Sequence, residues 1–393
     1  MFSLRTLALM ALAFSGAVNG AVCDSDFELE SDGDISKLSS CRELKGSLVV
    51  GEKVTRVTLP QELQTIAKDL VIQSATDLIV IEGPSLKKIG GLFELRELIR
   101  LQQLTMPKLA EVGGIRWVTL PNLRELQFET GITKASDVYI SDTLLQSLQG
   151  LNLTTANTFV VANNRYLKQV DLALKSVGDS LDINFNAKGI EASFPDLVWA
   201  MNVSLGDAGS ISFPKLQKVN SSISFVNNTF EEASFPALKE VGESLSFISC
   251  TELTNLTAPK LESVYGTFML ANNTKLEEVK GFQSLKSVGG AIDLSGVFTE
   301  VELPALEDVR GTFNLQSTGE LDCEPFNELD NSGVVQGGTF TCEGSKEVAE
   351  STEGGASTGG GKKKDDDKKG AAGTITANLA LVAAAGAAVL FAL

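Results

Sequence analysis

The chain has 393 residues, a formal net charge of -17, no histidine and five cysteines. Without histidine, a histidine-based catalytic triad and a histidine metal site are excluded, and the few cysteines leave no cluster for zinc. A strongly acidic chain also argues against binding to nucleic acid. No glycine-rich phosphate loop follows a predicted strand, so the sequence predicts neither a metal nor a cofactor.

Residues 1–20 are typical of a secretory signal peptide. Arg5 is followed by an apolar run that reaches Phe14, and small residues then lead to a cleavage position near Gly20. A buried first helix is the alternative, but acidic residues from Asp24 onward follow at once. The sequence therefore predicts secretion.

Residues 371–393 are predicted to be the propeptide of a glycosylphosphatidylinositol (GPI) anchor. The apolar run Leu379–Leu393 is shorter than the ~20 residues of a spanning helix, and small residues precede it from Gly370 onward. Gly370 is the predicted attachment residue. A tail-anchored protein is the alternative, which conflicts with the signal peptide.

An apolar-x-apolar triplet recurs through residues 48–322 in steps of 20 to 24 residues. Such triplets are typical of short strands with one face turned inward, and strands one coil apart stack as a parallel sheet. The sequence thus predicts an all-β solenoid of about thirteen coils. The paired inward positions are Leu48/Val50, Leu70/Ile72, Phe93/Leu95, Ile115/Trp117, Val138/Ile140, Phe159/Val161, Leu181/Ile183, Val203/Leu205, Ile223/Phe225, Leu245/Phe247, Phe268/Leu270, Ile292/Leu294 and Phe313/Leu315.

Two further columns follow this period. Eight of the ten prolines fall eight to ten residues before the next triplet and predict a corner there, whereas Pro121 is out of phase. Three residues past the triplet lies a column typical of the asparagine ladder of leucine-rich repeats: Thr143, Asn164, Asn186, Ala208, Asn228, Cys250 and Asn273. Cys250 is accordingly predicted to be a buried ladder residue rather than a reactive thiol.

The other four cysteines bracket the repeats. Cys23 and Cys41 lie in residues 21–47, and Cys323 and Cys342 lie in residues 323–343. A solenoid exposes an apolar coil at each end and needs caps, so we predict one disulfide within each pair.

Six Asn-x-Ser/Thr sequons and a polar tail complete the organisation. The sequons are at Asn152, Asn202, Asn220, Asn227, Asn255 and Asn272, and they predict exposed, N-glycosylated positions. Residues 344–370 contain Gly, Ser, Thr, Lys, Glu and Asp with almost no apolar residue, which predicts a disordered stalk.

The middle residue of each triplet should face outward, and its character changes along the chain. Arg116 and Tyr139 belong to the earlier, more varied group, and later positions are mostly small or polar. Because every sequon lies at or after Asn152, we expect the earlier face to be free of sugar and to contact a partner around Arg116 and Tyr139. Ordinary surface variation is the alternative. Asp182 and Asp293 could serve a polysaccharide-cutting enzyme, but their coils are too far apart along the array for a catalytic pair.

The signal peptide, the repeats with their proline, leucine and valine positions, the flanking cysteine pairs and the GPI signal together resemble the fungal GPI-anchored sporulation-specific/extracellular-mutant cell-wall proteins. Their repeats are similar to those of receptor L-domains, right-handed β-helical relatives of leucine-rich repeats. The resemblance implies a non-catalytic role in cell-wall organisation and integrity, wall glycans or mannoproteins as partners, and a location at the outer plasma membrane or in the wall. A dibasic pair before the attachment residue, here Lys368-Lys369, is associated in fungi with retention at the plasma membrane, but similar proteins also occur in the wall, so the pair leaves residence open. The Lys/Asp block of residues 362–369 departs from the Ser-rich stalks of that family.

Overall fold

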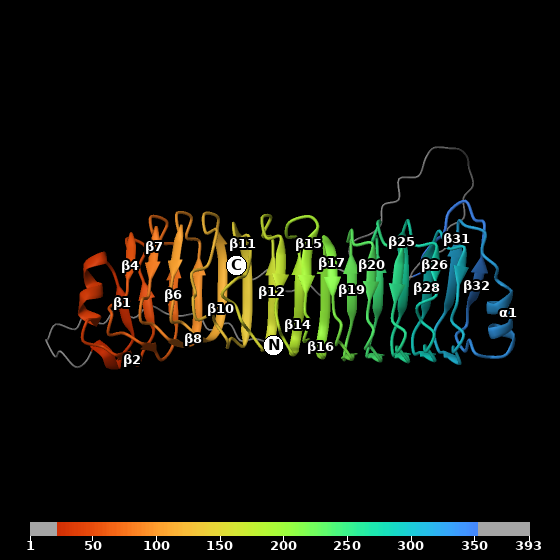
Figure 1. Cartoon of the computed structure of the whole chain (residues 1–393), viewed down its shortest axis with the longest axis horizontal. Coiled ribbons are helices and arrows are strands. Elements are labelled where there is room, and N and C mark those ends of the chain that lie inside the picture. The colour runs from red at the N-terminus through yellow and green to blue at the C-terminus, as the bar shows by residue number, and fades with distance from the viewer. Residues whose placement is uncertain (1–21, 353–393) are drawn as a thin grey trace, which may run out of the picture. The chain divides into compact units, whose positions relative to one another are not determined.

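The computed structural model describes residues 22–352 and divides the chain into two compact units, residues 1–200 and 201–393. The predicted signal peptide, the stalk beyond Thr352, the attachment residue Gly370 and the propeptide lie outside the described residues. Both units are stacks of parallel strands that repeat once per coil (Figure 1). The predicted all-β, disulfide-capped solenoid of about thirteen coils is confirmed.

In unit 1 the triplet strands form one parallel sheet, and every inward side chain of the predicted pairs is buried. Facing residues stay in register from coil to coil, as in Ile115↔Val138 and Val138↔Phe159. The sheet contains β1 (Phe27–Leu29), β3 (Leu48–Val50), β6 (Leu70–Gln73), β8 (Lys88–Arg96), β10 (Glu111–Leu120), β11 (Asp137–Thr143), β12 (Thr155–Ala162) and β14 (Ser176–Asn184), with the short β2 (Glu43–Leu44) and β5 (Thr65–Ile66) beside it.

A second row of strands closes the coils of unit 1 on another side and is interrupted. Its first part is β4 (Arg56–Thr58), β7 (Val80–Glu82) and β9 (Gln103–Thr105), and its second part is β13 (Gln169–Asp171) and β15 (Ile190–Ser193). Between the two parts this side has only isolated bridges, such as Thr105↔Gln127 and Ser147↔Gln169. The coils there are closed by loops.

Unit 2 repeats the same plan. The triplet strands are β16 (Trp199–Gly206), which begins in the last two residues of unit 1, then β19 (Ile223–Val226), β22 (Leu245–Ile248), β25 (Phe268–Asn273), β28 (Ile292–Gly296) and β31 (Phe313–Ser317). Short strands at the corners and on the other side are β17 (Ala208–Ser212), β18 (Lys218–Val219), β20 (Glu232–Ser234), β21 (Glu240–Val241), β23 (Asn255–Thr257), β24 (Ser263–Val264), β26 (Glu278–Val279), β27 (Ser287–Val288), β29 (Glu300–Val301) and β30 (Asp308–Val309). Phenylalanines stack inside, as Phe225 does on Phe247 with ring centroids 4.8 Å apart.

Each coil turns its corners with tight turns, which explains the prolines. The turn at each in-phase proline places a leucine in the core. Leu238, for example, is buried and donates its backbone N–H to the carbonyl of Phe235, the residue directly before Pro236. Pro121 belongs to the other corner, where Leu123 donates to the carbonyl of Leu120. Proline suits the second position of such a turn. Pro121 is therefore out of phase with the other prolines because it lies at a different corner of the coil.

The strands stack so closely that several coils carry glycine at the corner before the triplet strand. A Cβ atom on Gly242 would lie 1.8 Å from the carbonyl oxygen of Asn220 in the preceding coil, and one on Gly90 would lie 2.1 Å from that of Ala67. A real side chain does not fit at such a distance. Glycine at this corner therefore lets the backbones of neighbouring coils approach closely at Gly90 and Gly242, whereas Tyr265 and Arg310 occupy the same corner in other coils.

Both caps are more elaborate than the sequence predicted, because each adds a strand. In the N-terminal cap β1 pairs with β3, and in the C-terminal cap β32 (Phe340–Glu343) pairs with β31. The caps also contain the 3-10 helices η1 (Val22–Asp24) and η2 (Asp32–Leu38) and the helix α1 (Glu324–Asn331). The disulfides Cys23–Cys41 and Cys323–Cys342 are formed as predicted.

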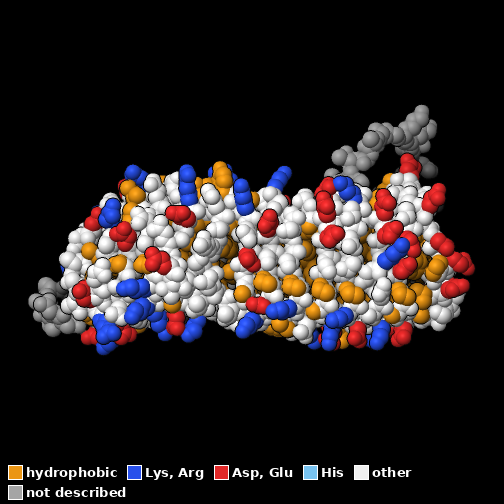
Figure 2. All heavy atoms as spheres, viewed as in Figure 1, with side chains coloured by type: hydrophobic (Ala, Val, Ile, Leu, Met, Phe, Trp, Pro, Cys, Tyr) orange, Lys and Arg blue, Asp and Glu red, His pale blue; other side chains and the backbone are white. Residues whose placement is uncertain are grey.

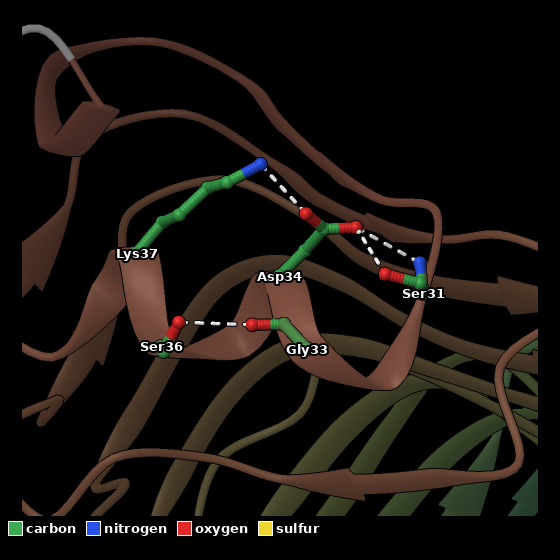
Figure 3. A network of polar contacts seen from close by, with 5 residues as sticks. All are labelled: Ser31, Gly33, Asp34, Ser36 and Lys37. Atoms are coloured by element: carbon green, nitrogen blue, oxygen red, sulfur yellow. Dashed lines mark hydrogen bonds and ion pairs between the residues drawn. The ribbon is translucent and has the colours of Figure 1, made fainter.

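Polar contacts hold η2 in place (Figure 3). Asp34 accepts hydrogen bonds from the backbone N–H and the hydroxyl of Ser31 at 2.9 and 2.8 Å, and Lys37 Nζ lies 2.6 Å from its other oxygen. The Asp34 carboxylate thus gives a partner to the backbone N–H of Ser31, the residue that precedes the helix. The cap thus closes the first coil with its own polar network.

Candidate binding face and its surroundings

A bend that follows each triplet strand decides which side chains reach the surface. One residue per coil has a left-handed backbone there, from Ser74 at φ 53° to Asn272 at φ 58°. The next residue turns inward and is the predicted ladder position. All seven predicted ladder residues are buried, with exposed fractions of 7% or less.

The ladder is held by hydrogen bonds between successive coils. Asn164 Oδ1 accepts from the backbone N–H and the hydroxyl of Thr143, at 3.1 and 2.7 Å, and Asn164 Nδ2 donates to two strand carbonyls. In unit 2, Asn273 Oδ1 accepts from the backbone N–H of Cys250 at 2.8 Å. The asparagines therefore satisfy backbone groups that each bend leaves unpaired.

Cys250 is a buried free thiol, as predicted. Its Sγ makes weak contacts of 3.7 and 3.8 Å to the carbonyls of Phe225 and Ile248. Burial raises the pKa of this thiol to about 11, so the reactive thiolate is disfavoured at neutral pH. The position is structural.

The outward row of unit 1, defined as Val49, Val71, Glu94, Arg116, Tyr139, Val160 and Asp182, lies on neighbouring strands in direct register. Its centre brings together three functional groups. Arg116 Nε lies 3.9 Å from Glu94 Oε1, and the Arg116 guanidinium lies 5.9 Å from the centre of the Tyr139 ring. The Arg116 side chain keeps 47% of its surface exposed, whereas that of Glu94 keeps 13%.

The predicted contact residues Arg116 and Tyr139 are therefore adjacent, and Glu94, which the sequence did not single out, joins them. Beneath them Trp117 is fully buried and packs edge-on against Phe93, with centroids 5.6 Å apart. A rigid strand with a large buried ring fixes the base of the exposed side chains. The arrangement suits recognition of a partner by charge and by an aromatic ring.

Asp182 and Asp293 do not form a catalytic pair in the described residues. Burial raises the pKa of Asp182, which accepts a hydrogen bond from Asn184 and has Val160 as its neighbour in the outward row. The nearest acid of that row is Glu94, four strands away, or ~19 Å at the spacing of stacked strands. Paired glycosidase carboxylates lie within about 10 Å.

Asp293 differs most from its prediction, because the expected outward side chain is completely buried. Residues 345–352, here called the C-terminal strap, lie across β31 and β28. The backbone N–H of Thr352 and the Ser351 hydroxyl donate to Asp293 Oδ2, the former at 3.0 Å. Asn314 Nδ2, also expected to face solvent, donates to Asp293 Oδ1 at 2.8 Å and to the Glu350 carbonyl at 2.9 Å. The described part of the predicted stalk thus packs on the sheet.

The sequon asparagines lie on the surface. Asn152, Asn220, Asn227, Asn255 and Asn272 are exposed, and Asn202 is half-buried with its Oδ1 accepting a hydrogen bond of 3.3 Å from the Ser222 backbone. Asn227 and Asn272 occupy the left-handed bend position, directly before the buried ladder residues Asn228 and Asn273. Five of the six sequons belong to unit 2.

On the face that Figure 2 shows, Lys and Arg side chains lie mainly along the upper and lower edges, whereas Asp and Glu side chains lie at these edges and also between them. Among residues 22–352 no helix is long and apolar enough to cross a membrane. In the same residues no group of three or more acidic or cysteine side chains is placed to hold a metal ion.

These features define a class: a disulfide-capped β-solenoid of leucine-rich-repeat-like coils with an asparagine ladder. The chain is 34% identical to "Protein ecm33" of Aspergillus fumigatus over 88% of its length and 87% of the relative's. It is 33% identical to a "Cell surface GPI-anchored protein" of Arthroderma benhamiae, with 86% and 87% covered, and 31% identical to "Sporulation-specific protein 22" of Saccharomyces cerevisiae, with 83% and 72% covered. The chain belongs to this fungal family of ecm33-like and sporulation-specific GPI-anchored cell-wall proteins. No protein-family model matches the chain, and no solved structure does.

Proposed function

We propose that this protein is a non-catalytic, GPI-anchored cell-surface glycoprotein that supports cell-wall organisation by binding wall glycan or protein through the outward row of unit 1. The observation that carries the proposal is the contact of Glu94, Arg116 and Tyr139 on neighbouring strands. An arginine half exposed beside an aromatic ring is typical of residues that dominate binding interfaces.

The names of the relatives support a location at the cell surface or in the cell wall. Several are named as cell-surface, GPI-anchored or cell-wall proteins. A GPI lipid joined at Gly370 after removal of residues 371–393 places the binding face outside the plasma membrane or in the wall. N-linked glycans on the six sequon asparagines cover mainly unit 2 and leave the outward row of unit 1 accessible.

The alternative is an enzyme that modifies wall polysaccharide. It would need two acids at a suitable distance, and the outward row of unit 1 offers Asp182 without a second carboxylate beside it. Incubation of the full chain with purified β-glucan, chitin and mannan tests it directly. Release of reducing sugar by the wild type, lost in Asp182→Asn, would support the enzyme and contradict our proposal.

The binding proposal is tested with the double variant Arg116→Glu, Tyr139→Ser in the full chain, expressed in its own host in place of the wild type. Charge reversal next to Glu94 and loss of the ring should weaken binding to isolated walls about tenfold or more. Cells with this variant should be as sensitive to wall-binding dyes as cells without the protein. The matched control, Ser224→Glu with Met269→Ser, alters the same outward positions in unit 2.

Surface labelling establishes that both variants reach the cell surface in equal amounts. Wild-type dye sensitivity and wall binding in the Arg116, Tyr139 variant would contradict the proposal. Equal defects in the two variants would show that the contact is not confined to unit 1.

A further inference from the structure

The interrupted side of unit 1 contains a polar cavity that is open to solvent, because all of its lining residues except Leu126 are exposed. It has a volume of about 660 Å³, within the range of roughly 300–1,000 Å³ found for ligand sites. Its lining comes from three successive coils: Gln102, Asn122, Arg124, Glu125, Leu126, Gln146, Ser147 and Gln149. We propose that this cavity binds a neutral oligosaccharide through its amide side chains, an inference that rests on the proposed function of binding.

The cavity exists because the second row of strands stops. β9 ends at Thr105 and the row resumes only at Gln169, so the chain between them closes its coils with loops and isolated bridges. Pro121 begins one of these loops, directly before Asn122. In the neighbouring coils a strand of the second row occupies this side. In the coils between Thr105 and Gln169 no such strand is present, and the space stays open.

Most lining side chains have no protein partner in the part of the chain that the structure describes. Gln102, Arg124, Gln146, Ser147 and Gln149 make no side-chain hydrogen bond or ion pair there. In the neighbouring coils, similar side chains pair from coil to coil, such as Arg100 with Asp77 at 3.0 Å. Unpaired donors and acceptors that converge on one space are available to a ligand.

The chemistry of the lining selects the class of ligand. Arg124 and Glu125 carry one charge each and together are neutral, so an anion gains nothing overall. Leu126 is the single apolar side chain of the lining, which disfavours an apolar ligand. Gln102, Gln146 and Gln149 with Ser147 offer both donors and acceptors, whereas Asn122 Nδ2 already donates to the Ile99 carbonyl. Each sugar hydroxyl likewise donates one hydrogen bond and accepts others. A neutral, polyhydroxylated ligand matches this set.

Two sources of such a ligand exist. One is a wall polysaccharide from outside the molecule. The other is the protein's own N-glycan on Asn152, because this exposed sequon follows Gln149 by only three residues. Both have the same chemistry, and the experiment separates them.

The test uses the full chain, purified in detergent, with laminarihexaose, chitohexaose and α-mannohexaose as probes in calorimetric titrations. Oligogalacturonate serves as the anionic comparison. We expect at least one neutral hexamer to bind and the anionic one not to bind. In Gln146→Ala, Gln149→Ala the loss of two amides should weaken binding about tenfold or more. Gln217→Ala, an exposed glutamine of unit 2, is the matched control and should bind normally.

Asn152→Gln decides between the sources. If the protein's own glycan occupies the cavity, this variant should bind added hexamer at least tenfold more tightly than the glycosylated wild type does. If the wall supplies the ligand, the two should bind alike. In either case the Gln146, Gln149 variant must lose the binding.

Absence of binding to any neutral hexamer in both the wild type and Asn152→Gln would overturn the inference. Binding that depends on Arg116 and Tyr139 but not on Gln146 and Gln149 would overturn it too, while leaving the proposed function intact. Conversely, normal wall organisation in cells with the Arg116, Tyr139 variant, together with cavity binding in vitro, would contradict the proposed face and keep the cavity.

Discussion

The two units use the same coil and present different surfaces. In unit 1 the outward row carries Arg116, which is exposed and contacts Glu94 on one side and Tyr139 on the other. In unit 2 the corresponding positions begin as serines, and at Asp293 and Asn314 they are buried under the chain's own C-terminal strap. Unit 2 also carries five of the six sequons.

The difference shows how a repeat separates folding from function. Inward positions and ladder positions are restricted by packing in both units, so the outward positions are free to vary. In unit 1 this freedom produces an exposed charged and aromatic cluster. In unit 2 it produces small polar side chains that accept a covering segment. We therefore expect substitutions at outward positions of unit 1 to weaken partner binding. Substitutions at outward positions of unit 2 should instead weaken the attachment of the C-terminal strap.

The ladder offers the sharpest comparison of stability. Asn164 in unit 1 has hydrogen-bonding neighbours on both sides, Thr143 and Asn186, whereas Asn228 in unit 2 lies between Ala208 and Cys250. Asn164→Ala should lower the free energy of unfolding by about 2–4 kcal/mol, because it leaves several buried groups unsatisfied. Asn228→Ala should cost about 1–3 kcal/mol, since fewer partners lose a bond.

Urea denaturation followed by circular dichroism measures both values. Asn163→Gly is the control, because Asn163 is exposed with φ 59°, a conformation that glycine adopts without strain. It should change stability little. A larger decrease in the free energy of unfolding for Asn228→Ala than for Asn164→Ala would contradict this account of the ladder.

The repeat explains how much of the fold the sequence could predict. The inward pairs and the ladder follow from a period that persists over many coils, so errors at single positions do not accumulate. The two disulfides were predictable because their cysteines flank the repeats, where a solenoid needs caps. The strand β32 was missed because Phe340 follows Phe313 by 27 residues, which is outside that period. The strand β1 was missed although Phe27 and Leu29 precede their partners Leu48 and Val50 by 21 residues, which is within it. The out-of-phase Pro121 was the one signal of the altered coils near the cavity.

The site was less predictable than the fold. Arg116 and Tyr139 could be chosen because strand alternation fixes the outward position, but the contact with Glu94 depends on side-chain geometry that no spacing reveals. The C-terminal strap could not be predicted. Its residues have no periodic pattern, and the composition of Glu350-Ser351-Thr352 is typical of a disordered segment. Buried polar side chains in other coils, above all Asp293 and Asn314, give it a place to bind.

The strap gives a second, smaller test of the contrast between units. Asp293→Ala removes the acceptor of the Thr352 N–H and of the Ser351 hydroxyl, so the strap should detach locally at a cost of about 1–3 kcal/mol. Hydrogen exchange of residues 345–352 should become faster. Asp182→Ala, at the corresponding outward position of unit 1, should leave that exchange unchanged. Full protection of the strap in Asp293→Ala would show that other contacts hold it.

The smallest expected effect compares the two caps. Asp34 of the N-terminal cap has its pKa lowered to about 2 from the ordinary 3.8, first by the hydrogen bond from Lys37 and then by that from Ser31. The first residue of α1 in the other cap follows Cys323, which makes no side-chain capping bond.

Because the folded-state pKa of Asp34 lies below the ordinary value, the contribution of Asp34 to stability is complete above about pH 4 and is lost as the pH falls toward 2. Asp34→Asn should thus lower the urea midpoint slightly at pH 7 and not at all near pH 2. Lys37→Met removes the first cause and should move this loss to higher pH; a loss at the same pH would assign the low pKa to Ser31 instead.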